Sequence, residues 1–104
     1  MIQGDVYWHK FKEPDKRRPV LILTRNSAIK NLNSVTIAQI TTTIRNLESV
    51  VWLDENDGMS QICAVNTDNI YTVQKDKLRN YITHLSEDRM NEVFEAIKFA
   101  FDFE

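Results

Sequence analysis

Short apolar runs separated by polar, turn-forming stretches occupy the first three quarters of the chain. The runs are rich in Val, Ile and Thr, the residue types that favour strands. Polar stretches such as 10–18 and 54–58 contain Pro, Gly, Asp or Asn, which are typical of loops and turns. The pattern therefore predicts six strands, at residues 6–8, 20–24, 35–40, 50–53, 62–65 and 70–73, with Pro19 at the start of the second.

The last part of the chain has a different period. Its apolar residues recur at i, i+3, i+4 and i+7, which places them on one face of an α-helix. Ser86 is suited to cap this helix, and Glu87 and Asp88 would lie in its first turn, where negative charge is favourable. The apolar face consists of Met90, Val93, Phe94, Ile97, Ala100 and Phe101. Six strands and one terminal helix predict a mainly β fold, a small SH3-like barrel with a C-terminal α-helix, in a single domain over residues 1–104.

The composition excludes several classes of protein. With 104 residues, 42% hydrophobic and 27% charged, the chain is typical of one globular domain. No apolar run approaches the ~18 residues of a membrane span, and the N-terminal residues lack the features of a signal peptide, so we expect a cytoplasmic protein with no membrane contact. The single cysteine, Cys63, cannot form an intramolecular disulfide, and with His9 and His84 it does not match a metal site. We expect neither metal nor cofactor.

The net charge of −2 conceals an uneven distribution of charge along the chain. Residues 1–45 contain eight Lys and Arg against three Asp and Glu, whereas residues 46–104 contain five against twelve. A basic first half favours an anionic partner, because the local field steers encounter more than the total charge does. Chance clustering on a solvated surface is the alternative that charge alone leaves open.

A candidate anion site lies where the first basic loop meets a buried strand. Arg18 directly precedes Pro19, so its backbone is fixed by the sheet while its planar guanidinium can bind two phosphate oxygens. The hydroxyls of Thr41 and Thr42 end the third predicted strand and could donate to the same phosphate. Ordinary strand propensity also explains these threonines. The phosphate-loop, serine-hydrolase and zinc-protease motifs are absent, so this loop carries the chemistry that remains.

Five segments of the chain occur in the order and spacing of a known family. They are GDVYW (4–8), RRPVLIL (17–23), AQITTT (38–43), DNIYTVQKDKL (68–78) and HLSEDRMNEV (84–93). Across nearly its whole length the sequence resembles the MazF/PemK toxins of bacterial toxin–antitoxin pairs. The resemblance implies a CcdB/PemK-type barrel, a homodimer, a cognate antitoxin and a metal-independent endoribonuclease that cuts single-stranded RNA, messenger or transfer, at a short sequence.

The resemblance also implies roles for particular residues. The arginine of the family's R-P motif corresponds to Arg18, and the threonine at the end of its third strand corresponds to Thr41. A loop glutamate corresponds to Glu13, in a loop that is shorter here than in typical members. An aspartate proposed as the base in some members corresponds to Asp68. Further along, the family's glutamine and arginine are replaced by Asn69 and Tyr71.

Cleavage without a metal uses the 2′-hydroxyl of the substrate as nucleophile. Several residues of the chain could assist this reaction. Arg18 would neutralise the developing phosphorane charge, and Thr41 would donate a hydrogen bond. Glu13 or Asp68 would accept the 2′-proton, and the sequence does not choose between them. His9 is interpreted as a strand-end surface residue rather than the general acid. RNA contacts are expected from Lys12, Lys16, Arg17, Thr42, Arg45 and Asn69, with Tyr71 stacking on a base.

Other residues and functions are interpreted more simply. Trp8 and Trp52 are expected in the core, and Cys63 is expected to be a buried small hydrophobe. A CcdB-like gyrase poison is the first alternative function, although the C-terminal segment lacks a tryptophan. A non-catalytic RNA-binding SH3-like module is the second alternative.

Overall fold

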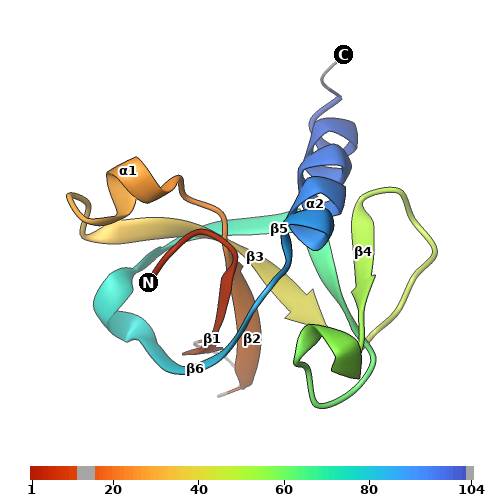
Figure 1. Cartoon of the computed structure of the whole chain (residues 1–104), viewed down its shortest axis with the longest axis horizontal. Coiled ribbons are helices and arrows are strands. Elements are labelled where there is room, and N and C mark those ends of the chain that lie inside the picture. Colours follow the sequence, from red (N-terminus) through yellow and green to blue (C-terminus); the bar gives the residue numbers. More distant parts are fainter. Residues whose placement is uncertain (12–15, 103–104) are drawn as a thin grey trace.

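The structure, a computed structural model, describes residues 1–11 and 16–102 of the chain. It contains six strands, one long C-terminal helix and three short helical turns (Figure 1). The strands are β1 (Asp5–Lys10), β2 (Arg17–Ile22), β3 (Ser34–Thr41), β4 (Val50–Leu53), β5 (Cys63–Gln74) and β6 (Leu78–His84). The helices are α1 (Asn26–Ile29) and α2 (Glu87–Ala100), and the 3₁₀ turns are η1 (Glu55–Asp57) and η2 (Lys75–Lys77).

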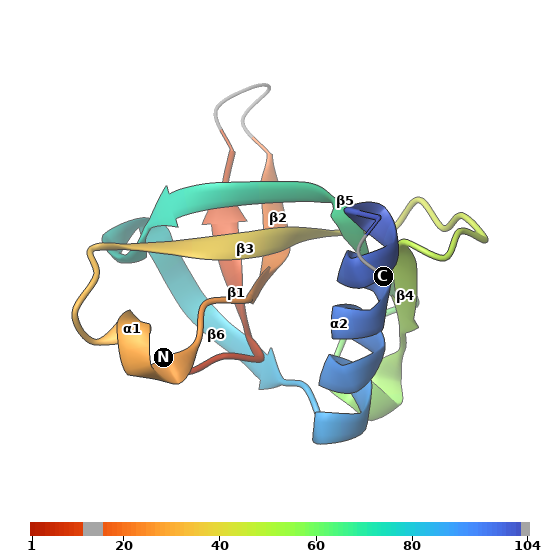
Figure 2. The ribbon, with the colours of Figure 1, turned by 90° about the horizontal axis from the view of Figure 1, so that it is seen from above.

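All six strands belong to one antiparallel sheet, in the order β4-β5-β3-β2-β1-β6. The long strand β5 pairs with β3 along most of its length and with β4 at its first residues. As Figure 2 shows, this lets the sheet curl, with α2 packed beside β4 and β5. The predicted mainly β barrel with a C-terminal helix is confirmed.

The two faces of the central strands enter two separate hydrophobic clusters. Along β2, Leu21 points to the cluster that α2 covers, whereas Val20 and Ile22 point to a smaller cluster closed by α1. The larger cluster also contains Ile40, Leu53 and Val93, all at most 1% exposed. Burying a side chain of this kind contributes ~1.5–3 kcal/mol, so both faces of the sheet are fixed by packing.

The helix prediction is accurate because its signals are local. Ser86 caps α2, and its side chain accepts a hydrogen bond from the Arg89 N–H at 3.2 Å. Met90 and Val93 are buried under the helix as the period predicts.

Among the described residues, no helix has both the length and the apolar character that crossing a bilayer requires.

Three strand predictions need correction. The segments 62–65 and 70–73 belong to one twelve-residue strand, β5, which a register shift interrupts. The strand β6 was missed because its residues 79–81 are polar or exposed, as suits an edge strand. Pro19 is the third residue of β2 rather than the first. Its missing N–H is tolerated because the pairs between β2 and β3 begin only at Val20.

Candidate functional site

Arg18 and Thr41 lie on neighbouring strands at the same end of the sheet. The pairs Val20↔Gln39 and Leu21↔Ala38 set the register of β2 against β3. Continuing this register by two residues places Arg18 opposite Thr41. Directly opposed residues of an antiparallel pair project from the same face, so the guanidinium and the hydroxyl share one side of the sheet.

The Arg18 side chain is available for a ligand. It is half-buried, and within residues 1–11 and 16–102 it takes part in no ion pair. The Thr41 oxygen accepts a hydrogen bond from the Thr43 N–H at 3.1 Å, which leaves its hydroxyl proton to donate. A cation that has no ion-pair partner in the described part of the chain, next to a hydroxyl donor, suits an oxyanion.

Two cavities meet at this pair of residues. One, of about 540 Å³, is lined by Trp8, Arg17 and Thr42 together with the loop that follows η1. The other, of about 340 Å³, is lined by polar residues that include Gln39, Arg45 and Asp68. Arg18 and Thr41 line both cavities. A chain that passes from one cavity to the other therefore crosses the guanidinium.

Asp68 and Asn69 reach the smaller cavity through an irregularity in β5. Ala38 pairs with Ile70, but the next β3 residue, Gln39, pairs with Asn66, so three residues of β5 bulge out of the ladder. Bulges of this kind redirect side chains next to active sites. The bulge therefore explains why Asp68 and Asn69 line a cavity that a regular strand would not supply.

Buried hydrogen bonds hold the bulge in place. Thr67, which is 1% exposed, donates from its hydroxyl to the Ser49 carbonyl at 2.6 Å. The Ser49 hydroxyl in turn donates to Oδ2 of Asp68 at 2.6 Å. The carboxylate is thus oriented by a neighbour that is itself buried.

The remaining predicted RNA contacts are spread around the two cavities. Arg17 lines the larger cavity and stacks over Trp8, 4.9 Å from the ring centroid, and Thr42 lines the same cavity. Arg45 and Asn69 line the smaller one. Tyr71 is 44% exposed and packs edge-on against Phe11, but it lines neither cavity. Lys16 is exposed next to β2, and both Lys12 and Glu13 lie outside the described residues.

His9 is not the strand-end surface residue that the sequence suggested. It lies inside β1, pairs directly with Arg18, and is half-buried, with its ring edge-on to Phe11 at 4.6 Å. Burial lowers the pKa of His9, against a smaller opposing effect of its hydrogen bond to the Lys77 backbone. Its Nδ1 is buried and has no hydrogen-bond partner among the described residues. His9 is therefore a neutral neighbour of Arg18 at pH 7.

The two tryptophans also differ from the prediction. Trp8 is half-buried and lines the larger cavity, and Trp52 is 51% exposed on the edge strand β4. Cys63 is buried as predicted, and burial, aided by Asp57 and Asp54, raises the pKa of its thiol to about 11. Sequence reasoning missed Gln61 and Tyr81, which line the larger cavity from the η1 loop and from β6. The sequence signal for them was weak, because Gln61 follows a segment with the pattern of a turn and Tyr81 lies in a polar stretch.

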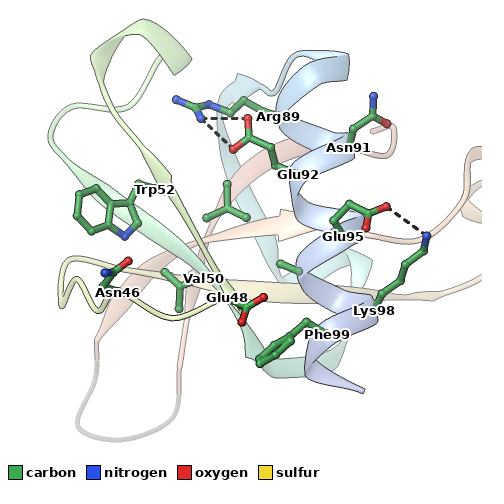
Figure 3. A pocket seen from close by; sticks show the side chains of 12 residues that line it. Asn46, Glu48, Val50, Trp52, Arg89, Asn91, Glu92, Glu95, Lys98 and Phe99 are labelled. Atoms are coloured by element: carbon green, nitrogen blue, oxygen red, sulfur yellow. Dashed lines mark hydrogen bonds and ion pairs between the residues drawn. The ribbon is translucent and has the colours of Figure 1, made fainter. Parts of the chain in front are cut away.

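A more voluminous hollow, of about 1000 Å³, lies elsewhere, between β4 and α2 (Figure 3). Its two cations are already paired, Arg89 with Asp57 and Glu92, and Lys98 with Glu95. Glu48 adds a further negative charge to its lining. This hollow is poorly suited to a phosphate chain, so size alone does not identify the site.

Comparisons with known proteins find a matching family model and several similar proteins. The family model described as "PemK-like, MazF-like toxin of type II toxin-antitoxin system" matches residues 2–101. Endoribonuclease MazF3 of Mycobacterium tuberculosis is 41% identical over 90 residues, covering 86% of this chain and 87% of that protein. Probable endoribonuclease MazF5 of the same species is 37% identical over 101 residues, covering 96% and 92%.

Solved structures show the same fold. Mycobacterium tuberculosis toxin MazF-mt6 superposes with a TM-score of 0.88 at 37% identity, covering 96% of this chain and 98% of that one. An endoribonuclease from a mycobacterial species, solved in complex with its cognate antitoxin, superposes with a TM-score of 0.89 at 27% identity, covering 100% and 97%.

Proposed function

Because this chain belongs to the PemK-like, MazF-like toxins of type II toxin–antitoxin systems, we propose that it cleaves single-stranded RNA at a centre formed by Arg18 and Thr41. The family and the endoribonuclease activity predicted from the sequence are confirmed by its relatives. One observation supports the location of the centre: the two adjacent cavities share these two side chains. The nucleotides on either side of the cleaved phosphate then occupy one cavity each.

The proposed reaction uses the substrate's own 2′-hydroxyl and no metal. The 2′-oxygen attacks the adjacent phosphorus, the 2′-O–P bond forms, and the P–O5′ bond breaks. The departing 5′-oxygen takes a proton from water, which leaves a 2′,3′-cyclic phosphate and a 5′-hydroxyl. Arg18 stabilises the extra charge on the phosphorane oxygens, and the Thr41 hydroxyl donates a further hydrogen bond. Preorganised donors of this kind need no rearrangement during the reaction, which is why they contribute strongly.

Asp68 is the base we propose to accept the 2′-proton. It lines the same cavity as Arg18 and Thr41, and Ser49 fixes its Oδ2. Within the described part of the chain, Oδ1 receives no hydrogen bond, so this oxygen is available for a proton. Glu13, the alternative from the sequence, belongs to the loop outside the described residues.

The decisive experiment measures cleavage of a long RNA in the presence of EDTA. Wild-type protein should give discrete fragments with 5′-hydroxyl ends, and Arg18→Ala should reduce kcat by at least ~100-fold, the effect of losing one such donor. Arg25→Ala is the matched control, because Arg25 is an exposed arginine next to α1, outside both cavities. Intact RNA with the wild type, or full activity of Arg18→Ala, contradicts the proposal.

We also propose a cognate antitoxin partner, a homodimer and action in the cytoplasm. One of the similar structures is described as an endoribonuclease in complex with its cognate antitoxin, which supports the first of these. Co-purification with the product of a neighbouring gene, and loss of cleavage in that complex, test the antitoxin. Light scattering of the isolated chain tests the dimer.

A further inference from the structure

The larger cavity beside Arg18 has the composition of a small-molecule pocket. Aromatic and apolar side chains such as Trp8, Met59 and Tyr81 form about half of its lining, and the rest is polar: Arg17, Arg18, Thr41, Thr42, Ser60 and Gln61. Its volume of about 540 Å³ falls within the ~300–1,000 Å³ of typical ligand pockets. A cavity with both apolar and polar walls suits a flat, partly polar ligand.

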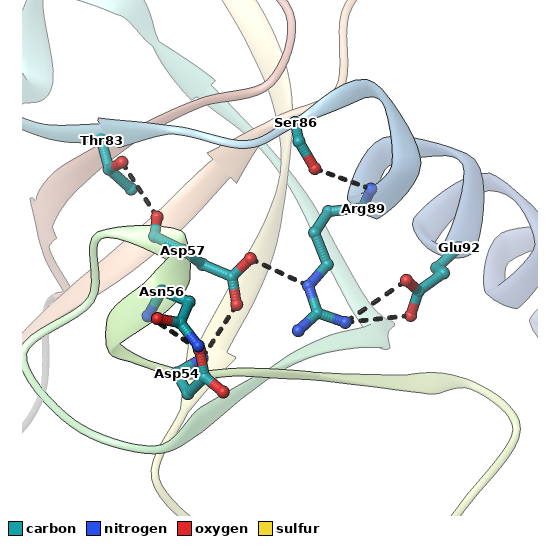
Figure 4. Close-up of polar contacts among 7 residues, drawn as sticks. All are labelled: Asp54, Asn56, Asp57, Thr83, Ser86, Arg89 and Glu92. Carbon is teal, nitrogen blue, oxygen red and sulfur yellow. Dashed lines mark hydrogen bonds and ion pairs between the residues drawn. The ribbon is translucent and has the colours of Figure 1, made fainter.

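The loop that forms one wall of this cavity is held rigidly against β6. Gly58 has φ +91°, and a Cβ at this position would lie 2.2 Å from the Thr83 hydroxyl oxygen, so only glycine permits the close approach. The Thr83 hydroxyl donates to the Asp57 carbonyl at 3.0 Å. Arg89 of α2 binds the Asp57 carboxylate at 2.9 Å (Figure 4). Because the loop is fixed from two sides, its next residues keep a defined place at the cavity.

Another part of the lining comes from an irregular part of β6. Tyr7 pairs with Tyr81 and Trp8 with Arg79, so Asn80 is an extra residue in the ladder. Asn80 has φ +57°, a left-handed conformation that is uncommon outside glycine. Strained bulges recur next to functional sites, where they redirect a side chain. Here the redirected side chain is Tyr81, which is 56% exposed and lines the cavity.

Tyr81 is positioned to offer an aromatic face. Its ring is held edge-on by Tyr7, with 5.8 Å between the ring centroids. The other large ring of the cavity, Trp8, already has the Arg17 guanidinium over it at 4.9 Å. Among the described residues no cation is recorded over the Tyr81 ring, so we take Tyr81 as the stacking surface.

Beyond Arg18 and Thr41, the polar groups of the cavity suit recognition of a base edge. The Gln61 amide carries both a donor and an acceptor, which allows it to pair with the edge of a nucleobase. Cys63 also lines the cavity, but burial raises the pKa of its thiol to about 11, so it is not a nucleophile at neutral pH. Apart from Arg18 and Thr41, the lining therefore supplies groups that bind rather than react.

We propose that this cavity holds one nucleobase of the RNA next to the cleaved phosphate, with Tyr81 stacking on it and Gln61 selecting it. The inference rests on the proposed function, because Arg18, shared by the cavity, fixes the phosphate of the same nucleotide. The flat base of the nucleotide then contacts the aromatic wall, while its charged phosphate binds the guanidinium.

The test compares variants by sequencing the 5′ ends of fragments cut from a randomised RNA pool. Tyr81→Ala should lower kcat/KM by roughly 10- to 100-fold, the range that base–aromatic stacking supports, while Tyr81→Phe stays close to wild type. Gln61→Ala should change the base preference at one position flanking the cleaved bond and leave the other positions as they are. The controls are Phe99→Ala, 53% exposed on α2, and Gln74→Ala, exposed at the end of β5.

The outcomes separate this inference from the proposed function. If the wild type cuts RNA in an Arg18-dependent way but Tyr81→Ala and Gln61→Ala keep its rate and preference, the pocket does not hold a base. A uniform loss of rate with unchanged preference in Gln61→Ala also overturns base selection. This variant alters only an exposed side chain, so it tests the idea even if Tyr81→Ala fails to fold. If the wild type does not cut RNA at all, the proposed function itself fails, and this inference with it.

Discussion

The ion pair between Asp57 and Arg89 connects α2 to the loop of the larger cavity, and its removal should weaken the fold measurably (Figure 4). Arg89 donates through Nε to Asp57 at 2.9 Å and through Nη1 to Glu92 at 3.3 Å. The Asp57 side chain is only 9% exposed, whereas that of Glu92 is 51% exposed. The Asp57 carboxylate also accepts the Asp54 N–H at 2.9 Å. The two acidic partners of Arg89 should therefore differ in energetic weight.

The expected magnitude follows from this difference. A hydrogen bond to a charged group contributes ~1.5–3 kcal/mol, and Arg89→Met leaves a nearly buried carboxylate with one donor fewer. We expect a loss of about 2–3 kcal/mol in the free energy of unfolding for Arg89→Met and a similar loss for Asp57→Asn. Glu92→Gln is the control and should cost less than ~1 kcal/mol, because exposed pairs are weak.

The same pair should make stability depend on pH. Burial alone would raise the pKa of Asp57, but the hydrogen bonds from Arg89 and the Asp54 backbone, with the Arg89 charge, lower it below its ordinary 3.8. A lowered pKa means that the folded state holds this proton less tightly than the unfolded state. The stabilisation is complete above the ordinary value and is lost as pH falls through the lower, folded-state value. The deficit of Asp57→Asn should therefore shrink on acidification.

Urea unfolding of wild type, both single variants and the double variant, at pH 7 and at pH 3, measures these effects. The double variant should lose less than the sum of the single losses, because the two side chains form one interaction. Additive losses, or a deficit of Asp57→Asn that grows on acidification, would refute the reasoning. An equal loss for Glu92→Gln would show that the exposed pair carries the stability instead.

Three further predictions concern single residues. Gly58→Ala should destabilise the protein by more than the ~1–2 kcal/mol of left-handed backbone strain, since the new Cβ would also collide with Thr83, and thermal unfolding measures this. Cys63 should react with a thiol reagent at pH 8 only when denaturant opens the fold, because its pKa of about 11 keeps it protonated; rapid native labelling would contradict this. Ser49→Ala should lower kcat with little change in KM, because it frees the Asp68 carboxylate to rotate; an unchanged kcat would remove Asp68 as the oriented base.

Much of the fold follows from local pattern. The strand predicted at 50–53 has the bounds of β4, and the helix predicted after Ser86 begins at Glu87. Both were predictable because a strand pattern and a helix cap depend on residues that are close in sequence. β6 was not predictable from its own residues, because an edge strand with one partner needs little hydrophobic alternation. Trp52 was misplaced because residue type alone does not reveal that β4 is also an edge strand.

The candidate site could likewise be predicted only in part from the sequence. Arg18 and Thr41 could be found from the sequence because they continue regular strands, whose register brings opposite residues together. Asp68 and Tyr81 reach the two cavities through bulges, at residues 67–69 and at Asn80. An extra residue in a strand moves every following side chain to the other face, so a period of two cannot place residues beyond it. Asp68 came only from the family resemblance, and Tyr81 came from neither source.

The bulges also suggest why the proposed catalytic centre, Arg18 and Thr41, and the residues around it should vary independently among relatives. A residue on the regular ladder is fixed by hydrophobic packing on both faces of β2 and β3, so replacing its neighbours disturbs the fold. A residue on a bulge is held by a few polar contacts, such as those of Thr67 and Ser49, and its side chain can change without disturbing either hydrophobic cluster. Arg18, proposed to stabilise the phosphate charge, thus lies on the regular part of the sheet. Asp68, proposed as the general base, and Tyr81, proposed to stack on RNA, lie at bulges, where a substitution should disturb the fold least.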